Sequence, residues 1–388
     1  MIEVINAILA KRPEIRIGVR TAVPRWLFDL TIKGHIQYSH LETDTGVVQV
    51  DSLTLDEADS IRRASSFHAD FVTRAASETQ QLRAIDAGLV VGDIPPLAFA
   101  VAASAGLPSI AIGNFTWDWI YSDYPRIRLA PSLLPTIQGA YAKATMALKL
   151  PMSEGFSEMP KVKDIPFIAR HATKSRKEVC SILKLPTTKP IVLMSFGGYG
   201  LPSLDTSVLT KLKKYTVVTV TNIPLGRTRE ETKTTRKKLA LVTLDEQAVY
   251  DLGVRYEDLV AASEVVVTKP GYGIIAECIA NNTAVLYTSR GHFPEYDVLT
   301  SEMPKYLRCA FMNHDDLFAG KWESHLDSLL AQAKPKKSTK TNGAEIAADI
   351  LLSTVDNPPK SPRRKRGRAK KTLKQSLKKT KGIKKTSP

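Results

Sequence analysis

Two glycine-punctuated segments, each following an apolar run typical of a strand, could contact a ligand through their backbone. The segment KPGYG contains Gly271 and Gly273 and runs into a helical pattern, and SFGGYG at 195–200 contains Gly197 and Gly198. Glycine lacks a Cβ, so a ligand can approach the chain closely, and the first turn of a helix presents unpaired N–H groups to an anion. These segments therefore suit a phosphate, unless the glycines only form tight strand-to-helix turns.

Two charged residues near Gly271 extend this chemistry from phosphate to nucleotide. Lys269 adds a positive charge just before the glycines. Glu277 lies about one and a half turns into the helix, where a carboxylate can accept hydrogen bonds from ribose hydroxyls. Because the carboxyl ends of parallel strands meet at one edge of a sheet, both glycine segments could flank one diphosphate. Together these residues predict a binding site for a nucleoside diphosphate.

The first half of the chain contains a strand–helix–strand unit, LVVGDIPPLAFAVAASAGLPSIAIGNF at 89–115. A proline pair begins its helix, and a glycine and a proline end it. Strands joined by such a crossover pair in parallel, and polar groups at their carboxyl ends face the crevice in which α/β folds bind ligands. Here those groups are Asp93 and the polar residues of 114–118.

Asp118 stands between two tryptophans in FTWDWIY, where it could act on a sugar. Its carboxylate is a candidate general base or an acceptor for a sugar hydroxyl, with Asp93 as the second candidate catalytic carboxylate. Trp117 and Trp119 could stack on a sugar ring, or they could pack in the cleft between two domains. His292, in a loop beside glycine, either approaches a phosphate or is exposed to solvent.

The order of the patterns predicts an α/β protein with two doubly wound, Rossmann-like domains that face a cleft. A chain of 388 residues exceeds the usual size of one hydrophobic core, and strands alternate with helices in both halves. A loop-rich, weakly patterned region extends to about residue 55. We assign residues 1–172 to the first domain, 173–333 to the second, 334–356 to a linker with a helix that packs on the body, and 357–388 to a tail.

The net charge of +16 is concentrated in the tail. Residues 357–388 carry 14 lysines and arginines and no acidic residue, and subtracting them leaves +2 for the rest of the chain. The tail has almost no apolar content, so we expect it to be disordered. Its charge would attract nucleic acid or an anionic membrane surface without reading a sequence. A tail that only improves solubility is the alternative.

Other features favour a soluble protein of the cytoplasm without a metal site. Three cysteines without a CxxC pair signal neither a disulfide framework nor zinc. The longest uncharged run, 94–113, is interrupted by prolines and glycine, which favours a buried unit over a membrane span, and no signal peptide opens the chain. The motif NHDD at 313–316 is typical of a helix N-cap rather than of metal ligands.

Longer stretches resemble GT-B glycosyltransferases. Residues 256–297 resemble the nucleotide-sugar-binding half of these enzymes, in which a glycine-containing loop opens a helix with a ribose-binding glutamate six residues later; Gly271 and Glu277 have that offset. The segments VVGDIPPLAFAVAASAGLPSIAIGNFTWDWIYSDY, SFGGYG, KPGYGIIAECIANNT and SRGHFPEYDVL resemble the glycosyltransferase-like domain of plant L-arabinokinases and its stand-alone bacterial relatives. No kinase segment follows, so sugar phosphorylation is not implied.

The resemblance implies a GT-B fold and a nucleotide-sugar donor, with UDP as the expected nucleotide and no permanently bound cofactor or metal. A helix dipole and basic groups would stabilise the leaving diphosphate. The unknown acceptor would lie against the first domain near Asp93, Asn114, Trp117 and Asp118. The residues expected to bind the donor are Gly197, Gly198, Lys269, Gly271, Gly273 and Glu277 at the nucleoside diphosphate, and Arg290, Glu295 and Asp297 at the sugar.

One departure from the family leaves the function open. Relatives start with an extra strand and a Gly/His-rich loop resembling GHGFGH, which supplies a candidate catalytic histidine. This chain starts after that loop, so we expect the first strand of the first domain to be missing, unless the true start lies upstream of Met1. The preferred hypothesis is a hexosyltransferase. The others are an inactive nucleotide-sugar-binding module or a sugar-nucleotide epimerase of the same fold, and a protein that acts through its basic tail on nucleic acid.

Overall fold

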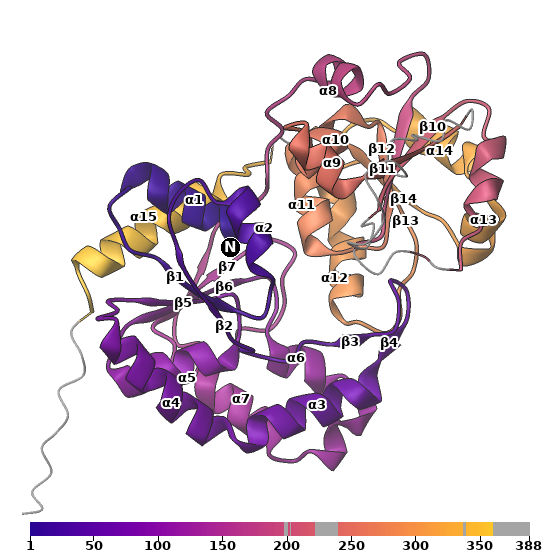
Figure 1. The fold of residues 1–388 in the computed structure, drawn as a ribbon. Coiled ribbons are helices and arrows are strands. Elements are labelled where there is room, and N and C mark those ends of the chain that lie inside the picture. Colours follow the sequence, from indigo (N-terminus) through magenta and orange to yellow (C-terminus); the bar gives the residue numbers. More distant parts are fainter. Residues whose placement is uncertain (198–200, 202, 222–239, 337–338, 360–388) are drawn as a thin grey trace, which may run out of the picture.

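A computed structural model of the chain describes residues 1–197, 201, 203–221, 240–336 and 339–359. Two α/β domains, each built on parallel strands, lie beside one another (Figure 1). The chain crosses from the first domain to the second before α8 and returns to the first domain before α15. The two α/β domains predicted from the sequence are therefore present.

The main sheet of the first domain has four parallel strands in the order β5-β6-β7-β8. Its strand β6 is buried on both faces, because Ile110 and Ile112 pack into one core and Ala111 packs into the other. Helices α1 and α15 cover the first of these faces, and α3 to α7 lie on the opposite side. The strands are β5 (Val90–Gly92), β6 (Ser109–Gly113), β7 (Met146–Lys149) and β8 (Val162–Asp164).

The helices of the first domain include the one predicted between β5 and β6, which begins at a proline and ends at Gly106 in the left-handed conformation. That strand–helix–strand prediction is confirmed. The helices are α1 (Ile2–Lys11), α2 (Arg25–Thr31), α3 (Glu57–Ala69), α4 (Phe71–Ala84), α5 (Pro96–Ala105), α6 (Trp117–Ser122), η1 (Pro125–Leu129), α7 (Leu133–Tyr141) and α15 (Gly343–Asp356).

Two further parallel strands of the first domain, β1 (Gly18–Thr21) and β2 (Gln37–His40), form a sheet of their own. Among the described residues, β1 pairs only with β2, and β5 pairs only with β6. The first domain thus has a divided sheet in place of the continuous one that a doubly wound domain predicts. A short antiparallel hairpin, β3 (Val48–Gln49) and β4 (Leu55–Asp56), follows and reaches toward the second domain (Figure 1).

The second domain has one continuous parallel sheet of six strands in the order β11-β10-β9-β12-β13-β14. Strand β12 at its centre is buried on both faces, with Val265 and Val267 in one core and Val266 in the other. The strands are β9 (Ile191–Ser195), β10 (Thr216–Thr221), β11 (Leu241–Asp245), β12 (Val265–Thr268), β13 (Ala284–Tyr287) and β14 (Cys309–Phe311).

Helices pack on both faces of this sheet, as the doubly wound pattern predicts. They are α8 (Arg176–Ile182), η2 (Thr206–Lys211), α9 (Glu246–Asp251), α10 (Tyr256–Ala262), α11 (Tyr272–Ala280), α12 (Glu295–Glu302), η3 (Met303–Lys305), α13 (His314–Ala319) and α14 (Glu323–Ala331).

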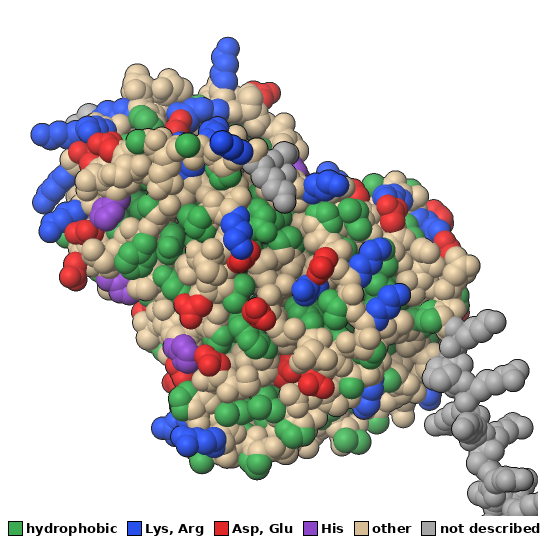
Figure 2. Space-filling view, turned by 180° about the vertical axis from the view of Figure 1, so that it is seen from behind, with side chains coloured by type: hydrophobic (Ala, Val, Ile, Leu, Met, Phe, Trp, Pro, Cys, Tyr) green, Lys and Arg blue, Asp and Glu red, His purple; other side chains and the backbone are tan. Residues whose placement is uncertain are grey.

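The surface carries both signs of charge. Figure 2 shows acidic and basic side chains interspersed over much of the face seen from behind. No helix in the described ranges is long and apolar enough to cross a membrane. The predicted basic tail lies outside the described residues from residue 360 onward, so its interactions stay predictions.

Candidate functional site

The loop between β12 and α11 leaves open space beside its glycines. Gly271, the N-cap of α11, has φ −152°, an extended conformation that any residue adopts, and Gly273 is not left-handed either. A Cβ added to Gly271 or Gly273 would meet nothing within 4 Å. Turn geometry therefore does not explain these glycines, and what they provide is access to the first turn of a helix.

The other glycine segment differs. Gly197 has φ +71°, so the turn after β9 does favour glycine for its backbone conformation. Gly198, the second predicted phosphate contact of this segment, lies outside the described residues. Among the glycines of the two segments that the structure describes, Gly271 and Gly273 are free of the simple turn explanation.

Two cations flank the loop before α11. Lys269 directly follows β12, and its Nζ donates a hydrogen bond to Oε1 of Gln49 at 2.8 Å. Arg290, in the loop after β13, donates from Nη1 to the carbonyl oxygen of Pro270 at 3.2 Å and lies 4.4 Å from the ring centroid of Phe293. Because β12 and β13 are parallel neighbours, their following loops meet at one edge of the sheet.

The surroundings of both cations favour an anionic ligand. Burial, and then repulsion by Arg290, lower the pKa of Lys269 to about 8, against an opposing effect of Asp51. Burial also lowers the pKa of Arg290, although the Glu295 carboxylate opposes this. The buried Nε of Arg290 has no hydrogen-bond partner in the part of the chain that the structure describes. An anion between the two side chains would favour the charged form of both.

Glu295, at the start of α12, lies against Asn114 of the first domain. Asn114 donates from Nδ2 to Oε1 of Glu295 at 2.7 Å, across the cleft. Burial raises the pKa of Glu295, while Asn114 and Arg290 act in the opposite direction. Thus one residue expected at the donor sugar and one expected at the acceptor are in direct contact. Asp297, in the same turn of α12, is exposed.

Glu277 is buried on α11 and is bound by an arginine that no sequence pattern singled out. Arg170, in the segment that joins the domains, donates from Nε to Oε1 of Glu277 at 2.6 Å. Burial raises the pKa of Glu277, and the charge and hydrogen bond of Arg170 oppose that shift. Ribose binding by Glu277 stays a prediction, and this ion pair is the environment in which it would occur.

On the first-domain side of the cleft, a strained turn holds Asp93. Ile94 has φ +59°, a conformation that β-branched residues rarely adopt. The Tyr141 hydroxyl donates to the carbonyl oxygen of Ile94 at 2.8 Å, and a Cβ at Gly113 would lie only 2.7 Å from Cγ2 of Ile94. Packing therefore maintains the strain, and Asp93 is exposed at the carboxyl end of β5.

The same tyrosine fixes the start of α6, which carries Asp118. The backbone N–H of Trp117 donates to the Tyr141 hydroxyl at 3.1 Å. Asp118 is 7% exposed, and its Oδ1 is buried without a hydrogen-bond partner among the described residues. Trp117 stacks on Tyr121 of the same helix at a centroid distance of 5.5 Å, and its stacking on a sugar stays a prediction.

Asp44, from the weakly patterned region after β2, is a third acidic residue on the first-domain side, in addition to Asp93 and Asp118. Trp117 donates from Nε1 to Oδ2 of Asp44 at 3.0 Å. Burial raises the pKa of Asp44 to about 6; the Trp117 hydrogen bond lowers this pKa, and the charges of Asp93 and Glu42 raise it further. A group with such a pKa exchanges a proton near neutral pH, as a general base or acid does. No sequence pattern pointed to Asp44, because its neighbours show no strand or helix periodicity.

Each domain inserts one loop into the other, and we call residues 51–54 and 289–294 together the interdomain clasp. Leu53 is 9% exposed within a core of the second domain, and the Gly291 N–H donates to its carbonyl oxygen at 2.6 Å. Phe293 is 7% exposed within a core of the first domain. The clasp contains Arg290, and its Asp51 acts on the pKa of Lys269, so both domains contribute to the surroundings of the two cations.

His292 belongs to the clasp. Its Nδ1 lies 3.0 Å from Oε1 of Glu57, and its Nε2 lies 2.7 Å from Oδ2 of Asp123, both in the first domain. The side chain is 51% exposed, so it is partly in solvent and also bridges the domains. In this structure, the contacts of His292 are interdomain ones.

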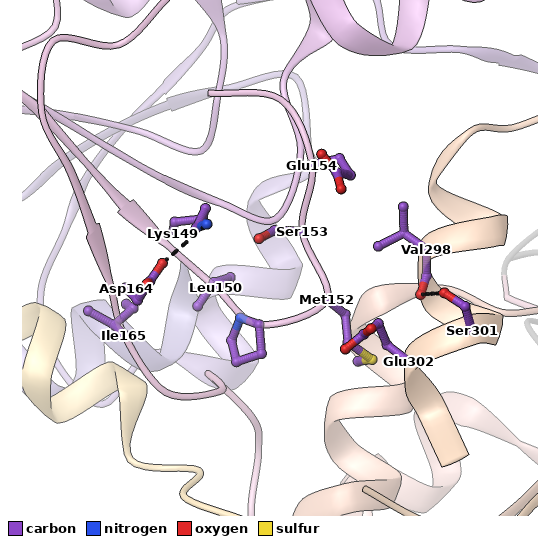
Figure 3. Close-up of a pocket in the computed structure, with 11 residues that line it drawn as sticks. Lys149, Leu150, Met152, Ser153, Glu154, Asp164, Ile165, Val298, Ser301 and Glu302 are labelled. Atoms are coloured by element: carbon purple, nitrogen blue, oxygen red, sulfur yellow. Dashed lines mark hydrogen bonds and ion pairs between the residues drawn. The ribbon is translucent and has the colours of Figure 1, made fainter. Parts of the chain in front are cut away.

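A cavity of about 510 Å³ adjoins the cleft beside α12 (Figure 3). Its walls come from the ends of β7 and β8, the segment after β7, and α12. Glu154 in its wall connects it to the cleft, because the Glu154 N–H donates to the carbonyl oxygen of Asn114 at 3.1 Å. Lys149 and Asp164 lie 3.3 Å apart on one side, and Met152 adds apolar surface. The volume is typical of small-molecule sites, at about 300–1,000 Å³.

No group of His, Cys, Asp or Glu within the described ranges is arranged to hold a metal ion. The NHDD motif forms the predicted helix start, because the Asn313 side chain accepts a hydrogen bond from the N–H of Asp316. This N-cap prediction is confirmed.

Comparison with known proteins supports the resemblance seen in the sequence. No protein-family model matches the chain. The chain is 28% identical over 375 residues to L-arabinokinase of Arabidopsis thaliana, an alignment that covers 92% of this chain and 33% of that protein. The chain thus spans about a third of the length of this curated relative.

Solved structures share the fold over nearly the whole chain. The glycotransferase of kitacinnamycin has a TM-score of 0.53 at 14% identity and covers 92% of this chain and 93% of its own. UGT89C1 of Arabidopsis thaliana, complexed with UDP, has a TM-score of 0.56 at 12% identity, and the match covers 91% of this chain and 95% of UGT89C1. A candidate UDP-N-acetylglucosamine 2-epimerase from Listeria monocytogenes has a TM-score of 0.52 at 14% identity, and the match covers 93% of this chain and 94% of that protein.

These comparisons confirm two predictions from the sequence. The chain is an α/β protein with the GT-B fold, and it is similar to L-arabinokinase. At identities of 12–14% the solved structures concern the fold, so the chemistry has to be argued from the site.

Proposed function

We propose that the protein is a glycosyltransferase that moves a hexosyl group from a UDP-linked sugar to an acceptor held by the first domain. One observation carries this proposal: Lys269 and Arg290 stand beside an open glycine loop, and a buried guanidinium N–H group of Arg290 has no partner among the described residues. Such a site suits a diphosphate. UDP is the expected nucleotide, because UGT89C1, which shares the fold, was solved with UDP.

The donor half of the reaction uses charge that is already in place. The two cations and the first turn of α11 would bind the diphosphate, and they would bind it more strongly as the bond between sugar and phosphate breaks and negative charge builds up on the leaving oxygen. Glu277 would accept hydrogen bonds from the ribose. Glu295 and Asp297 at the start of α12 would face the sugar, with Glu295 released from Asn114 when the sugar enters.

The acceptor half needs a group that removes a proton. Asp44 has a pKa of about 6, so it is ionised at neutral pH and can take the proton of an acceptor hydroxyl. The acceptor oxygen then forms the new bond to the anomeric carbon, and the electron pair of the old bond leaves on the diphosphate. Asp93 and Asp118 remain candidates for the same role or for binding acceptor hydroxyls.

The test is calorimetric titration of the full chain with UDP, GDP and dTDP sugars, followed by measurement of nucleotide release with and without acceptor extracts. We expect binding of a UDP sugar that is weakened in Lys269→Met, and release of UDP that depends on an acceptor. Binding without any release would favour the inactive binding module. Absence of binding to every nucleotide sugar would overturn the proposal.

An epimerase is the second candidate, because the Listeria monocytogenes structure shares the fold equally well. An epimerase changes the sugar without an acceptor. Incubation with UDP-sugars and chromatography of the products distinguishes the two activities, since a new UDP-sugar isomer would appear in place of free UDP.

A further inference from the structure

We infer that Arg170 is a positioning residue, which holds the carboxylate of Glu277 in one orientation for the ribose hydroxyls of the bound nucleotide. The inference rests on the proposed function, because it assumes that a nucleotide binds beside α11. It assigns a role in donor recognition to the segment between the domains, which no motif of the sequence pointed to.

Arg170 lies between two buried carboxylates of the second domain. Both its Nε, at 2.6 Å, and its Nη2 bind Oε1 of Glu277. Its Nη1 lies 3.6 Å from Oε2 of Glu257, a residue that is 1% exposed and that Arg255 holds from the other side at 2.7 Å. The guanidinium is therefore fixed by more than one contact and can fix Glu277 in turn.

The backbone around Arg170 is attached to the same helix. Asn281, at the end of α11, donates from Nδ2 to the carbonyl oxygen of Arg170 at 3.0 Å and accepts from the N–H of Ala172 at 2.9 Å. Two residues of α11, Glu277 and Asn281, thus hold this segment by its side chain and by its main chain. Arg170 is therefore attached to α11 by several contacts.

The geometry leaves one oxygen of Glu277 for a ligand. Both contacts with Arg170 end on Oε1, and no hydrogen bond among the described residues ends on Oε2. Glu277 is 6% exposed, so burial disfavours its charged form, and the nearby Glu257 and Glu3 carboxylates act in the same direction. Arg170 opposes all three effects. Without it, the carboxyl group would be protonated at higher pH and would lose acceptor strength for ribose.

A stabilising role alone is a poor explanation for this pair. Desolvation offsets much of the attraction in a buried ion pair, and apolar residues of similar size often stabilise as well or better. Here the pair is placed on the helix whose first turn carries the open glycines. A role in setting the direction of a binding carboxylate accounts for a charged pair at this place.

The experiment compares UDP with 2′-deoxy-UDP by titration calorimetry on the full chain. The wild-type protein should prefer UDP by about tenfold or more, because one hydrogen bond to a charged group is lost in the deoxy compound. In Arg170→Met the affinity for UDP should fall to that for 2′-deoxy-UDP, while the affinity for 2′-deoxy-UDP changes less than about threefold. Arg170→Lys, which keeps the charge but not the fork of donors, should retain part of the preference.

The control is Arg255→Met, which removes a partner of Glu257 but no contact with Glu277. It should keep the wild-type preference for UDP. In Arg170→Met the preference should return only in part as the pH rises and Glu277 loses its proton, because the charge is restored but not the orientation that Arg170 sets, whereas the wild-type preference should change less with pH. Circular dichroism shows whether each variant folds. If Arg170→Met does not fold, the comparison is made with Arg170→Lys.

The outcomes separate this inference from the function it rests on. A wild-type preference for UDP that survives unchanged in both Arg170 variants overturns the inference but leaves the proposed function intact. Equal loss of preference in Arg255→Met also overturns it, because the effect would then be structural. If the wild-type chain binds neither nucleotide, it is the proposed function that fails.

Discussion

The two walls of the cleft differ in the charges beyond the ends of their strands and in the continuity of their sheets. The second domain presents Lys269 and Arg290 at the edge of a continuous six-stranded sheet. The first domain presents Asp44, Asp93 and Asp118 at the edge of strands that are divided between two sheets. A basic wall suits the phosphates of a donor, whereas an acidic wall suits an acceptor that gives up a proton.

The side chains of the basic wall are held in place by more extensive structure than those of the acidic wall. The basic wall stands on strands buried on both faces, and its cations are fixed by hydrogen bonds to Gln49 and to the carbonyl oxygen of Pro270. The acidic wall depends on local devices, namely the strained turn at Ile94 and the Tyr141 hydroxyl that binds it. Donor binding should therefore tolerate changes in the acidic wall better than turnover does.

The largest expected effect comes from the acidic wall. Asp44→Asn should lower the rate of UDP release with acceptor by about 10²–10⁴-fold, because general bases contribute roughly that factor, and should leave UDP-sugar affinity unchanged. Asp29→Asn, an exposed carboxylate paired with Arg25, is the matched control and should have no effect. Equal loss of binding and turnover in Asp44→Asn would contradict the division of labour between the walls.

The basic wall should affect binding first. Lys269→Met should weaken UDP-sugar binding by about 10–100-fold, the value of one hydrogen bond to a charged group, as measured by calorimetry. Lys214→Met is the control, since Lys214 is an exposed lysine of the same domain paired with Asp327. Unchanged affinity in Lys269→Met would remove the basic wall from the donor site.

The pH dependence should combine the two walls. Asp44 must be ionised, so turnover should rise as the pH increases through about 6, and Lys269 must be protonated, so turnover should fall as the pH increases beyond about 8. Outside these limits the change should approach tenfold per pH unit. In Lys269→Arg the falling limb should move to higher pH. A falling limb that stays at the same pH in this variant would assign it to another group.

The smallest expected effect concerns the basic tail. Removal of residues 360–388 should change UDP-sugar affinity less than about twofold, because the basic wall is formed without the tail. The same truncation should abolish salt-sensitive binding to a DNA duplex of random sequence, if the full chain shows it. Loss of UDP-sugar binding in the truncated chain would mean that the tail belongs to the donor site.

Patterns confined to short stretches predicted the structure well. The strand–helix–strand unit around Asp93 and the loop before α11 depend on periodicity, proline and glycine within about 30 residues. Both are present with the predicted order, and the offset between Gly271 and Glu277 places the carboxylate on the same helix as the glycines. Local rules sufficed because each unit forms its own backbone geometry.

Contacts between distant segments could not be predicted in this way. Asp44 and Leu53 lie in a region without periodicity. Their roles depend on distant contacts, of Asp44 with Trp117 and of Leu53 with a core of the second domain. Arg170 is 107 residues from its partner Glu277. The division of the first-domain sheet is likewise a matter of which strands meet, and residue patterns within a strand do not specify that.

The double crossing between the domains has a mechanical consequence. The outgoing and returning segments are held together, since Ile168 and Asn342 form an antiparallel bridge and the Gly343 N–H donates to the carbonyl oxygen of Phe167 at 2.9 Å. A single tether would let one domain twist freely against the other, but two bonded strands resist torsion and yield mainly to flexing. The two domains should therefore move apart by a hinge rotation about these two segments rather than by twisting. On closure, the same residues of the two walls should face each other again.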